Sequence, residues 1–266
     1  MNGTPHPTRK GARRMTDVPA DVLADLNAGR AETRTLVEMY AVDMAGLLDR
    51  IVPGLGPALN AEGGADGRSK GGTGITRRMA AAGRLLLDAR GPAIIATLAT
   101  HPSDTVRGWG AYALGAWDEP DLAERLARIR PFADDPHFGV REWAWLALRA
   151  WIAADIDQTI AHLTPWTAEA SPKLRRFAVE STRPRGVWCK HIAALKADPA
   201  RGLPLLEPLR ADPDPYVQDS VANWLNDAAR GAPDWVRELC ARWRGDEASP
   251  ATDRICRRAL RSLKGA

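Results

Sequence analysis

The sequence predicts an all-α protein built as a solenoid of repeated helix pairs. Apolar residues recur at spacings of three and four along most of the chain, and no segment sustains the alternation of a β-strand. A helical segment of related pattern recurs after residue 77, and turns rich in Pro and Asp separate its copies. With 45% hydrophobic and 26% charged residues among 266, the composition is that of a globular protein with a real core.

The first 76 residues contain three regions of different character. Residues 1–16 are basic and polar and lead into no apolar run, so we expect a disordered arm and not a secretory signal. Residues 19–50 predict helices, and residues 53–76, with eight glycines, predict a flexible loop between helices. The GGTG in this loop lacks both a preceding strand and a following Gly-Lys-Ser/Thr, which disfavours nucleotide binding. We expect residues 17–266 to form a single repeat domain.

The repeat becomes visible when one apolar position is aligned between the copies. The aligned residues are separated by 34, 34, 43 and 38 positions, and the residue after each is usually basic. Second helices are expected over residues 120–132, 152–163, 199–209 and 234–243. A helix pair recurring about every 40 residues is the period of HEAT and armadillo arrays, whose inner helices line a concave surface. The aligned residues are Val106, Val140, Leu174, Val217 and Ile255.

The net charge of +4 is concentrated in two segments. Residues 171–200 carry seven cations against two acids, and residues 252–264 carry five against one. Such clusters suit a phosphate backbone, although a solvated basic face explains them equally well. The three cysteines (Cys189, Cys240 and Cys256) have no close pairing, which argues against a disulfide scaffold or a zinc site and fits a reducing cytoplasm. No apolar run approaches the length of a membrane span.

Three acidic residues, Glu142, Glu180 and Asp227, interrupt the repeat helices among apolar or basic neighbours. Each is explained by a structural ion pair or a helix cap as well as by catalysis. Glu180, for example, has Arg176 at i−4 and Arg183 at i+3. Phosphates repel carboxylates, however, so acids within the most basic repeats favour a catalytic role.

Specific motifs surround two of these acids. They are ESTRPR at 180–185 with Trp188, YVQDSVANWLND at 216–227, and RRALRSL at 257–263. Together they resemble the AlkC branch of the AlkC/AlkD HEAT-like DNA alkylation-repair glycosylases, over residues 18–265. The resemblance implies excision of N-alkylated bases and a DNA-facing cleft lined by acids and an aromatic residue. By this resemblance, Glu180, Asp227 and Trp188 match positions of the family motifs, and the segment around Glu142 matches the family only in outline. Departures include Ser181, Gly186-Val187 and Gln218.

Physical chemistry supports this assignment independently. An N-alkylated base is cationic and leaves readily, so the enzyme need not protonate it. The transition state instead needs negative charge near the sugar C1′ and a carboxylate that positions or deprotonates the attacking water. A Trp face adds cation–π attraction of about 0.5–2 kcal/mol. Four other tryptophans (Trp109, Trp143, Trp145 and Trp224) are expected in the core. The expected phosphate contacts are Arg175, Arg176, Arg183, Arg185 and Lys190.

These observations predict a monofunctional glycosylase that acts on alkylated bases in DNA and leaves an abasic site. Its expected partner is double-stranded DNA containing alkylated bases, bound by a monomer without metal, cofactor or membrane. The alternatives are a non-catalytic HEAT module that binds damaged or branched DNA and a protein-binding scaffold, which the basic clusters and embedded acids disfavour.

Overall fold

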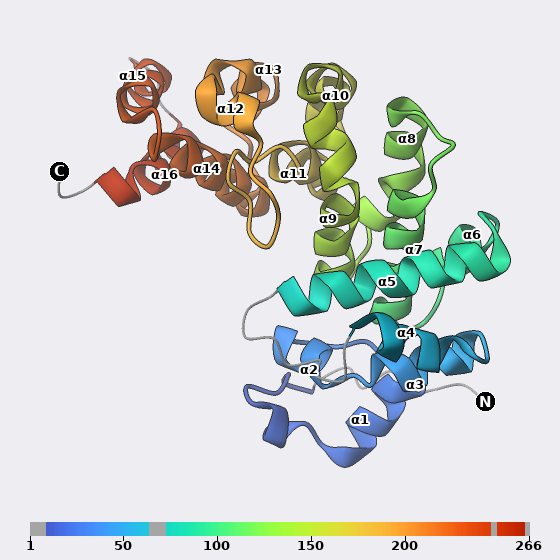
Figure 1. The fold of residues 1–266 in the computed structure, drawn as a ribbon. Helices are drawn as coiled ribbons and strands as arrows, with labels where there is room; N and C mark the ends of the chain where they lie inside the picture. Colours follow the sequence, from blue (N-terminus) through green and yellow to red (C-terminus); the bar gives the residue numbers. More distant parts are fainter. Residues whose placement is uncertain (1–8, 64–72, 246–248, 264–266) are drawn as a thin grey trace. The chain divides into compact units, whose positions relative to one another are not determined.

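The computed structural model describes residues 9–63, 73–245 and 249–263, and all regular structure within these ranges is helical (Figure 1). The prediction of an all-α fold is therefore confirmed. Contacts divide the chain into two compact units. The first comprises Met1–Asp121 with Ala127–Ala147, and the second comprises Leu122–Leu126 with Leu148–Ala266. The single domain over residues 17–266 stays a prediction.

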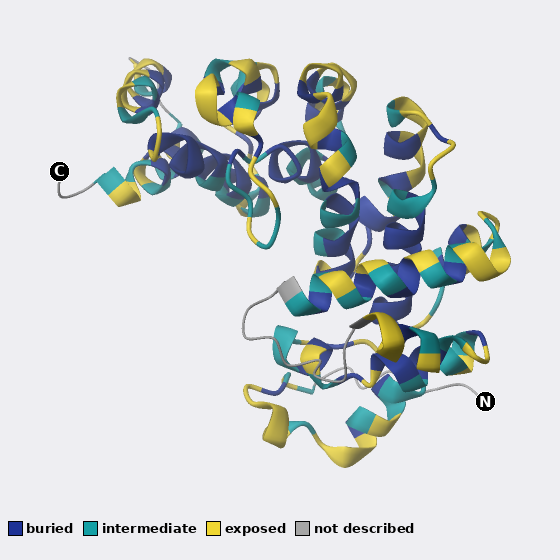
Figure 2. Cartoon of the chain, in the orientation of Figure 1, coloured by how far each residue is buried: buried dark blue, intermediate teal, exposed yellow. Residues whose placement is uncertain are grey.

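The first unit is built around the buried helix α7, which packs against α5 and α6. Figure 2 shows α7 buried along most of its length. Gly83 permits the close approach of α5, because a Cβ there would lie 2.7 Å from the backbone nitrogen of Ala113. Trp109 and Trp143 are buried in this core, as predicted. The elements are η1 (Met15–Asp17), α1 (Ala20–Asn27), α2 (Leu36–Ala41), α3 (Met44–Ile51), α4 (Leu55–Gly63), α5 (Thr73–Arg90), α6 (Ile94–Ala99) and α7 (Asp104–Ala116).

Two helices, α8 (Leu122–Ala133) and α9 (Phe138–Ala154), contribute residues to both units. In the second unit, α14 packs against both α11 and α16. The indole of Trp224 is fully buried there and donates to the carbonyl of Thr182 at 3.1 Å. The remaining elements are α10 (Ile156–Leu163), η2 (Thr164–Ala168), α11 (Pro172–Glu180), α12 (Ala193–Ala197), η3 (Pro199–Gly202), α13 (Leu203–Leu206), η4 (Glu207–Leu209), α14 (Pro215–Ala229), α15 (Pro233–Arg244), α16 (Pro250–Ala259) and η5 (Arg261–Leu263).

Three helices of the second unit, α11, α14 and α16, begin in the same way. Ser171, Asp214 and Ser249 each cap a helix through the side chain, and each is followed by a proline at the first helical position. A short polar cap satisfies a free backbone N–H, and proline loses nothing at that position because its missing N–H would have no helical partner. The Pro-containing turns identified in the sequence thus start helices as well as separating them.

In two repeats, the basic residue after the aligned apolar position binds the acid in the turn before the next repeat helix. Arg107 binds the carboxylate of Asp135 through Nε at 2.7 Å and Nη2 at 3.1 Å. Arg175 binds Asp212 with the same two distances. Each guanidinium also donates to two carbonyls in the turn before its own helix. These arginines form what we call the arginine ladder, and their first role is to hold successive repeats together.

Two expectations for the N-terminal region require correction. The loop expected across 53–76 is wrong for residues 55–63, which are helical in α4, and for residues 73–76, which begin α5; residues 64–72 lie outside the described part of the chain. Residues 9–16 were expected in a disordered arm, yet Ala12 is buried and Arg9 binds Glu38. The polar character of this segment is visible in the sequence, but its interaction with the buried carboxylate of Glu38 is not.

Candidate active site

The two strongest acidic candidates of the sequence, Glu180 and Asp227, meet at one arginine in the second unit. Glu180 is the last residue of α11, and Asp227 lies near the end of α14, which packs against α11. Arg183 donates from Nη1 to Glu180 Oε1 at 2.7 Å and from Nε to Asp227 Oδ2 at 2.9 Å. One guanidinium therefore fixes both carboxylates in a single cluster.

Glu180 is the inner member of this pair, with 5% of its side chain exposed. Ser220 donates a short hydrogen bond to Oε2, and Arg176 lies 3.8 Å away. Burial raises the pKa of Glu180, but the charges of Arg176 and Arg183 and the bond from Ser220 outweigh it, so the pKa is lowered overall. Glu180 is thus held ionised, and its oxygens are occupied by protein donors.

Asp227 is the outer member, and 12% of its side chain is exposed. Its Oδ2 accepts from Arg183, whereas Oδ1 accepts no hydrogen bond from the described residues. The two acids therefore have different capacities. Glu180 holds Arg183 in place, while Asp227 keeps one oxygen available for a water molecule or a ligand.

The loop after α11 carries Trp188, and the next residue, Cys189, lies within electrostatic range of Glu180, Arg183 and Asp227. The two ends of the loop are joined by a hydrogen bond from Ile192 N to Pro184 O at 3.0 Å. Trp188 is partly exposed and has φ = 62°, in the left-handed region that non-glycine residues rarely adopt. Because such a conformation persists only where surrounding contacts impose it, the loop must be held firmly.

Arg149 on α9 holds the loop. Its buried guanidinium donates to the carbonyls of Ser181 and Arg183, both at 2.6 Å, and to that of Lys190 at 3.3 Å. It thereby joins both limbs of the loop around Trp188. Burial lowers the pKa of Arg149. Sequence reasoning missed this residue, although a cation within the apolar run WLALRAW is a visible signal. Ser220, which binds Glu180, carried no signal of its own.

The surroundings of Asp227 are electropositive. His191, three residues after Trp188, is exposed, and partial desolvation together with the nearby cations Lys196 and Arg185 lowers its pKa. In the same way, burial and three arginines, including Arg183, lower the pKa of Arg261. The cations outnumber the acids here, which suits an anionic ligand.

The predicted phosphate contacts divide into two groups. Arg175 is committed to Asp212 in the ladder, Arg183 bridges the two acids, and Arg176 lies 4.4 Å over the ring of Tyr216. These three arginine side chains are mostly buried, and each interacts with an acid or an aromatic ring of the protein. Arg185 reaches the carbonyl of Asp227 at 3.1 Å with its Nε, and Lys190 is exposed. Those two remain open to a ligand.

Glu142, the third acid, lies in the first unit. It is partly exposed on α9 and accepts a hydrogen bond from Trp145 Nε1 at 2.9 Å. Trp145 is buried, as expected of a core tryptophan. Since Glu142 belongs to the other unit, its place in the cluster stays a prediction.

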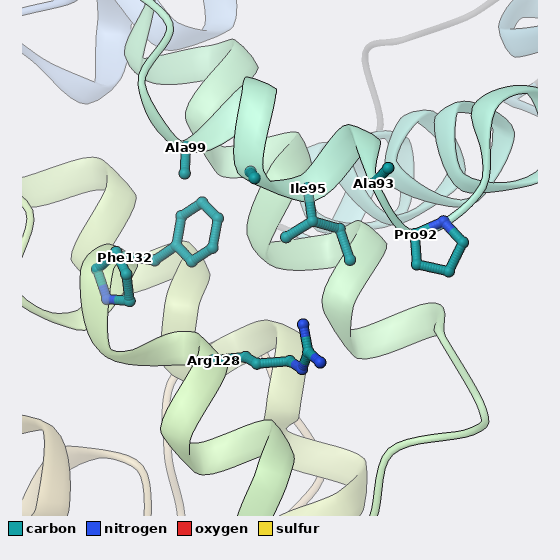
Figure 3. Close-up of a pocket in the computed structure, with 8 residues that line it drawn as sticks. Pro92, Ala93, Ile95, Ala99, Arg128 and Phe132 are labelled. Carbon is teal, nitrogen blue, oxygen red and sulfur yellow. The ribbon is translucent and has the colours of Figure 1, made fainter.

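An apolar cavity in the first unit offers different chemistry. It has a volume of about 320 Å³ between α6 and α8, and Figure 3 shows Ile95 and Phe132 beside it. Among the described residues that line it, Arg128 is the one charged residue and none is a carboxylate. Across the described residues, no group of three or more His, Cys, Asp or Glu side chains is arranged to hold a metal ion. No described helix is long and apolar enough to cross a membrane.

Comparison with known proteins supports the repeat fold. The family model for HEAT repeats matches residues 91–182. The uncharacterized protein YhaZ of Bacillus subtilis is 43% identical over 98 residues, which are 37% of this chain and 27% of YhaZ. The structure of Pseudomonas fluorescens alkylpurine DNA glycosylase AlkC, bound to DNA containing an abasic site analog, aligns with a TM-score of 0.66 and 24% identity. That alignment covers 95% of this chain and 65% of AlkC.

A second solved structure, AlkD2 from Streptococcus mutans, aligns with a TM-score of 0.57 and 18% identity, covering 77% of this chain and 96% of AlkD2. The chain therefore has a HEAT-like helical-repeat fold, and its resemblance to the AlkC/AlkD proteins is confirmed at the level of the fold. It spans about two thirds of the length of AlkC and about a quarter of YhaZ.

Proposed function

We propose that this HEAT-repeat chain is a monofunctional DNA glycosylase that hydrolyses the N-glycosidic bond of cationic N-alkylated bases and leaves an abasic site. The observation that carries the proposal is the carboxylate pair of Glu180 and Asp227 joined by Arg183 in electropositive surroundings. Phosphates repel carboxylates, so a surface that only bound phosphates would gain nothing from the carboxylate of Asp227, whose side chain is 12% exposed. The fold shared with AlkC, a protein solved on DNA with an abasic site analog, agrees with the proposal.

In the proposed reaction Asp227 is the catalytic residue. The C1′–N bond breaks, and its electron pair goes to the cationic base, which leaves as a neutral molecule. Water forms the new C1′–O bond, and its proton passes to Asp227 Oδ1, the oxygen that accepts no hydrogen bond from the described residues. The negative charge of Asp227 also stabilises the oxocarbenium character that develops on the sugar.

The other residues of the cluster act through Asp227 or on the lesion. Arg183 orients Asp227, and Glu180 keeps Arg183 in place from the buried side. We propose Trp188 as the face that receives the cationic base, since its indole is partly exposed on the loop fixed by Arg149. Arg185 and Lys190 are the proposed phosphate contacts, and the repeat surface that carries them is the proposed DNA-binding face.

The test is base release from duplexes that carry N3- or N7-methylated purines, under single-turnover conditions. We expect wild-type protein to release the base and Asp227→Asn to lose at least 100-fold in rate, because Asn is neutral and cannot accept the proton. Asp219→Asn is the matched control, since Asp219 is a partly exposed acid on the same helix α14 whose partners are Arg254 and Arg258. It should retain the wild-type rate.

One observation favours a non-catalytic DNA-binding protein instead: both acids are hydrogen-bonded to Arg183, as purely structural ion pairs are. Under that alternative the wild-type protein binds duplex DNA but releases no base from any alkylated substrate. Equal base release by Asp227→Asn and wild type would contradict the assignment of Asp227.

A further inference from the structure

A short basic segment at the start of the described chain is fixed to the first unit by a buried carboxylate. The segment, Arg9–Arg14, reads RKGARR and contains four cations. Its anchor is Glu38 on α2, whose side chain is 0% exposed. Nothing in the proposed base-release chemistry uses either of them.

The contacts of Glu38 explain how the segment is held. Its carboxylate accepts from Arg9 Nη2, from the backbone N of Ala12 and from the backbone N of Arg34, each at 2.8 Å. Thr35 caps α2 and receives the N–H of Glu38 at 3.3 Å, which is half of a capping box. In a complete box the acid would return to the N–H of Thr35. Here Glu38 turns to the basic segment and to the neighbouring N–H of Arg34.

The backbone of the segment lies close against the start of α2. Thr35 Oγ1 donates to the carbonyl of Ala12 at 2.9 Å. A Cβ on Gly11 would lie 2.4 Å from Thr35 Cγ2 and 3.0 Å from Arg34 Cβ, so only glycine permits this approach without displacement. The segment is therefore built to lie in one position on the first unit.

The charges of the segment are only partly neutralised. Arg9 pairs with Glu38, and Arg14 pairs with Asp17. Lys10 and Arg13 are exposed, and neither forms an ion pair or hydrogen bond with the described residues. Burying a carboxylate is costly unless it is fully hydrogen-bonded, as Glu38 is. Because Glu38 fixes the backbone of the segment, it also fixes the backbone positions of Lys10 and Arg13. Cations fixed in advance lose less freedom when they bind an anionic lattice.

We propose that this basic segment is a second contact with duplex DNA, in which Lys10 and Arg13 bind backbone phosphates and Glu38 is the positioning residue. The contact carries no base recognition, because flexible ammonium and guanidinium groups on a surface segment bind phosphates without reading sequence. This inference rests on the proposed function only in taking duplex DNA as the ligand.

The experiment measures the affinity of the full chain for an undamaged duplex as a function of salt. Each lost phosphate contact lowers the log–log salt slope by about 0.9, so Lys10→Ala with Arg13→Ala should lower it by about 1.8. Affinity near 0.1 M salt should fall roughly 10- to 60-fold. Arg50→Ala with Arg90→Ala is the matched control: both residues are exposed, no ion pair or hydrogen bond joins either to a described residue, and the net charge changes equally. It should leave the slope unchanged.

A second variant tests the role of Glu38. Trypsin must bind the Arg9 side chain to cut after it, and Glu38 holds that guanidinium. Glu38→Gln should therefore speed cleavage after Arg9 and lower DNA affinity, although Lys10 and Arg13 are intact. Bound duplex should slow cleavage after those two cations in the wild-type protein.

The outcomes separate this inference from the proposed function. A wild-type slope in the Lys10/Arg13 variant, or an equal change in the control, overturns the segment as a DNA contact even if base release is normal. Loss of slope in a protein that releases no base supports the segment and rejects the glycosylase. Unchanged trypsin cleavage in Glu38→Gln rejects Glu38 as its positioning residue.

Discussion

Replacing Arg149 by methionine should separate the anchoring of the Trp188 loop from the chemistry of Asp227. The buried guanidinium makes two short hydrogen bonds of 2.6 Å to the loop and a longer one of 3.3 Å. A charge-assisted bond contributes about 1.5–3 kcal/mol net. Burying the charge offsets part of this, as the lowered pKa of Arg149 indicates. We expect a loss of about 2–4 kcal/mol in the free energy of unfolding.

The same substitution should slow base release more than it weakens DNA binding. Without Arg149, the loop loses the contacts that join its two limbs, and Trp188 can leave its left-handed conformation. A displacement of about 1 Å at a reacting centre costs up to about 100-fold in rate. We therefore expect the single-turnover rate to fall roughly 10- to 100-fold at saturating protein, where weaker binding has no effect.

Urea unfolding and single-turnover base release, measured side by side, check this prediction. Arg141→Met is the control, because Arg141 lies on the same helix α9 and donates to the carbonyls of Asp135 and Pro136 near the start of that helix, both at 2.8 Å. It should cost stability without slowing release at saturating protein. If Arg149→Met is destabilised but releases base at the wild-type rate, Arg149 has a structural role only.

Three further predictions follow from individual contacts. Trp188→Gly should relieve the strain of the left-handed backbone and leave the free energy of unfolding unchanged or higher. It should nevertheless slow base release about 2- to 30-fold, because the cation–π contact is lost. A wild-type rate would exclude Trp188 from the lesion site. Burial raises the pKa of Glu38, but the bonds from Arg9, Ala12 and Arg34 lower it to about 2 from 4.5. Since the folded-state pKa is lower than the unfolded one, this stabilisation is present above about pH 4.5 and is lost as the pH falls toward 2, up to about 3 kcal/mol. Urea unfolding at pH 6, 4 and 3 should therefore show a smaller loss of stability in Glu38→Gln than in the wild-type protein. Ser220→Ala removes a buried donor to Glu180 and should cost about 1–3 kcal/mol in thermal or urea unfolding, with DNA affinity retained.

The helix pairs were predictable because local chemistry specifies them. The segments 103–117 and 214–229 became α7 (Asp104–Ala116) and α14 (Pro215–Ala229), since caps, prolines and apolar spacing all act within a few residues. Errors arose where a distant residue decides the outcome. The N-terminal segment is held by Glu38, 26 residues beyond Ala12. The glycine-rich composition of 53–76 concealed a helix over 55–63.

The candidate site was predictable in its acids but not in its arrangement. Glu180 and Asp227 stood out as charges among apolar and basic neighbours, and the structure brings them to one arginine. Their order, with Glu180 inside and Asp227 outside, depends on helix packing that no local pattern encodes. Arg149 escaped notice because its partners are backbone carbonyls, which every sequence contains and no motif marks.

Charge counted along a sequence overstates the charge that a ligand meets, and the arginine ladder shows why. Arg175 belongs to the most basic segment, yet Asp212 binds it at 2.7 and 3.1 Å with 14% of the arginine side chain exposed. Arg175→Met should therefore cost about 3 kcal/mol of unfolding free energy, because Asp212 is left buried and unpaired, and should leave the salt slope of DNA binding unchanged. Exposed Lys190 should behave in the opposite way: Lys190→Met should keep wild-type stability and lower the slope by about 0.9. If Arg175→Met lowers the slope while Lys190→Met does not, burial and pairing do not decide which cations of this chain reach DNA.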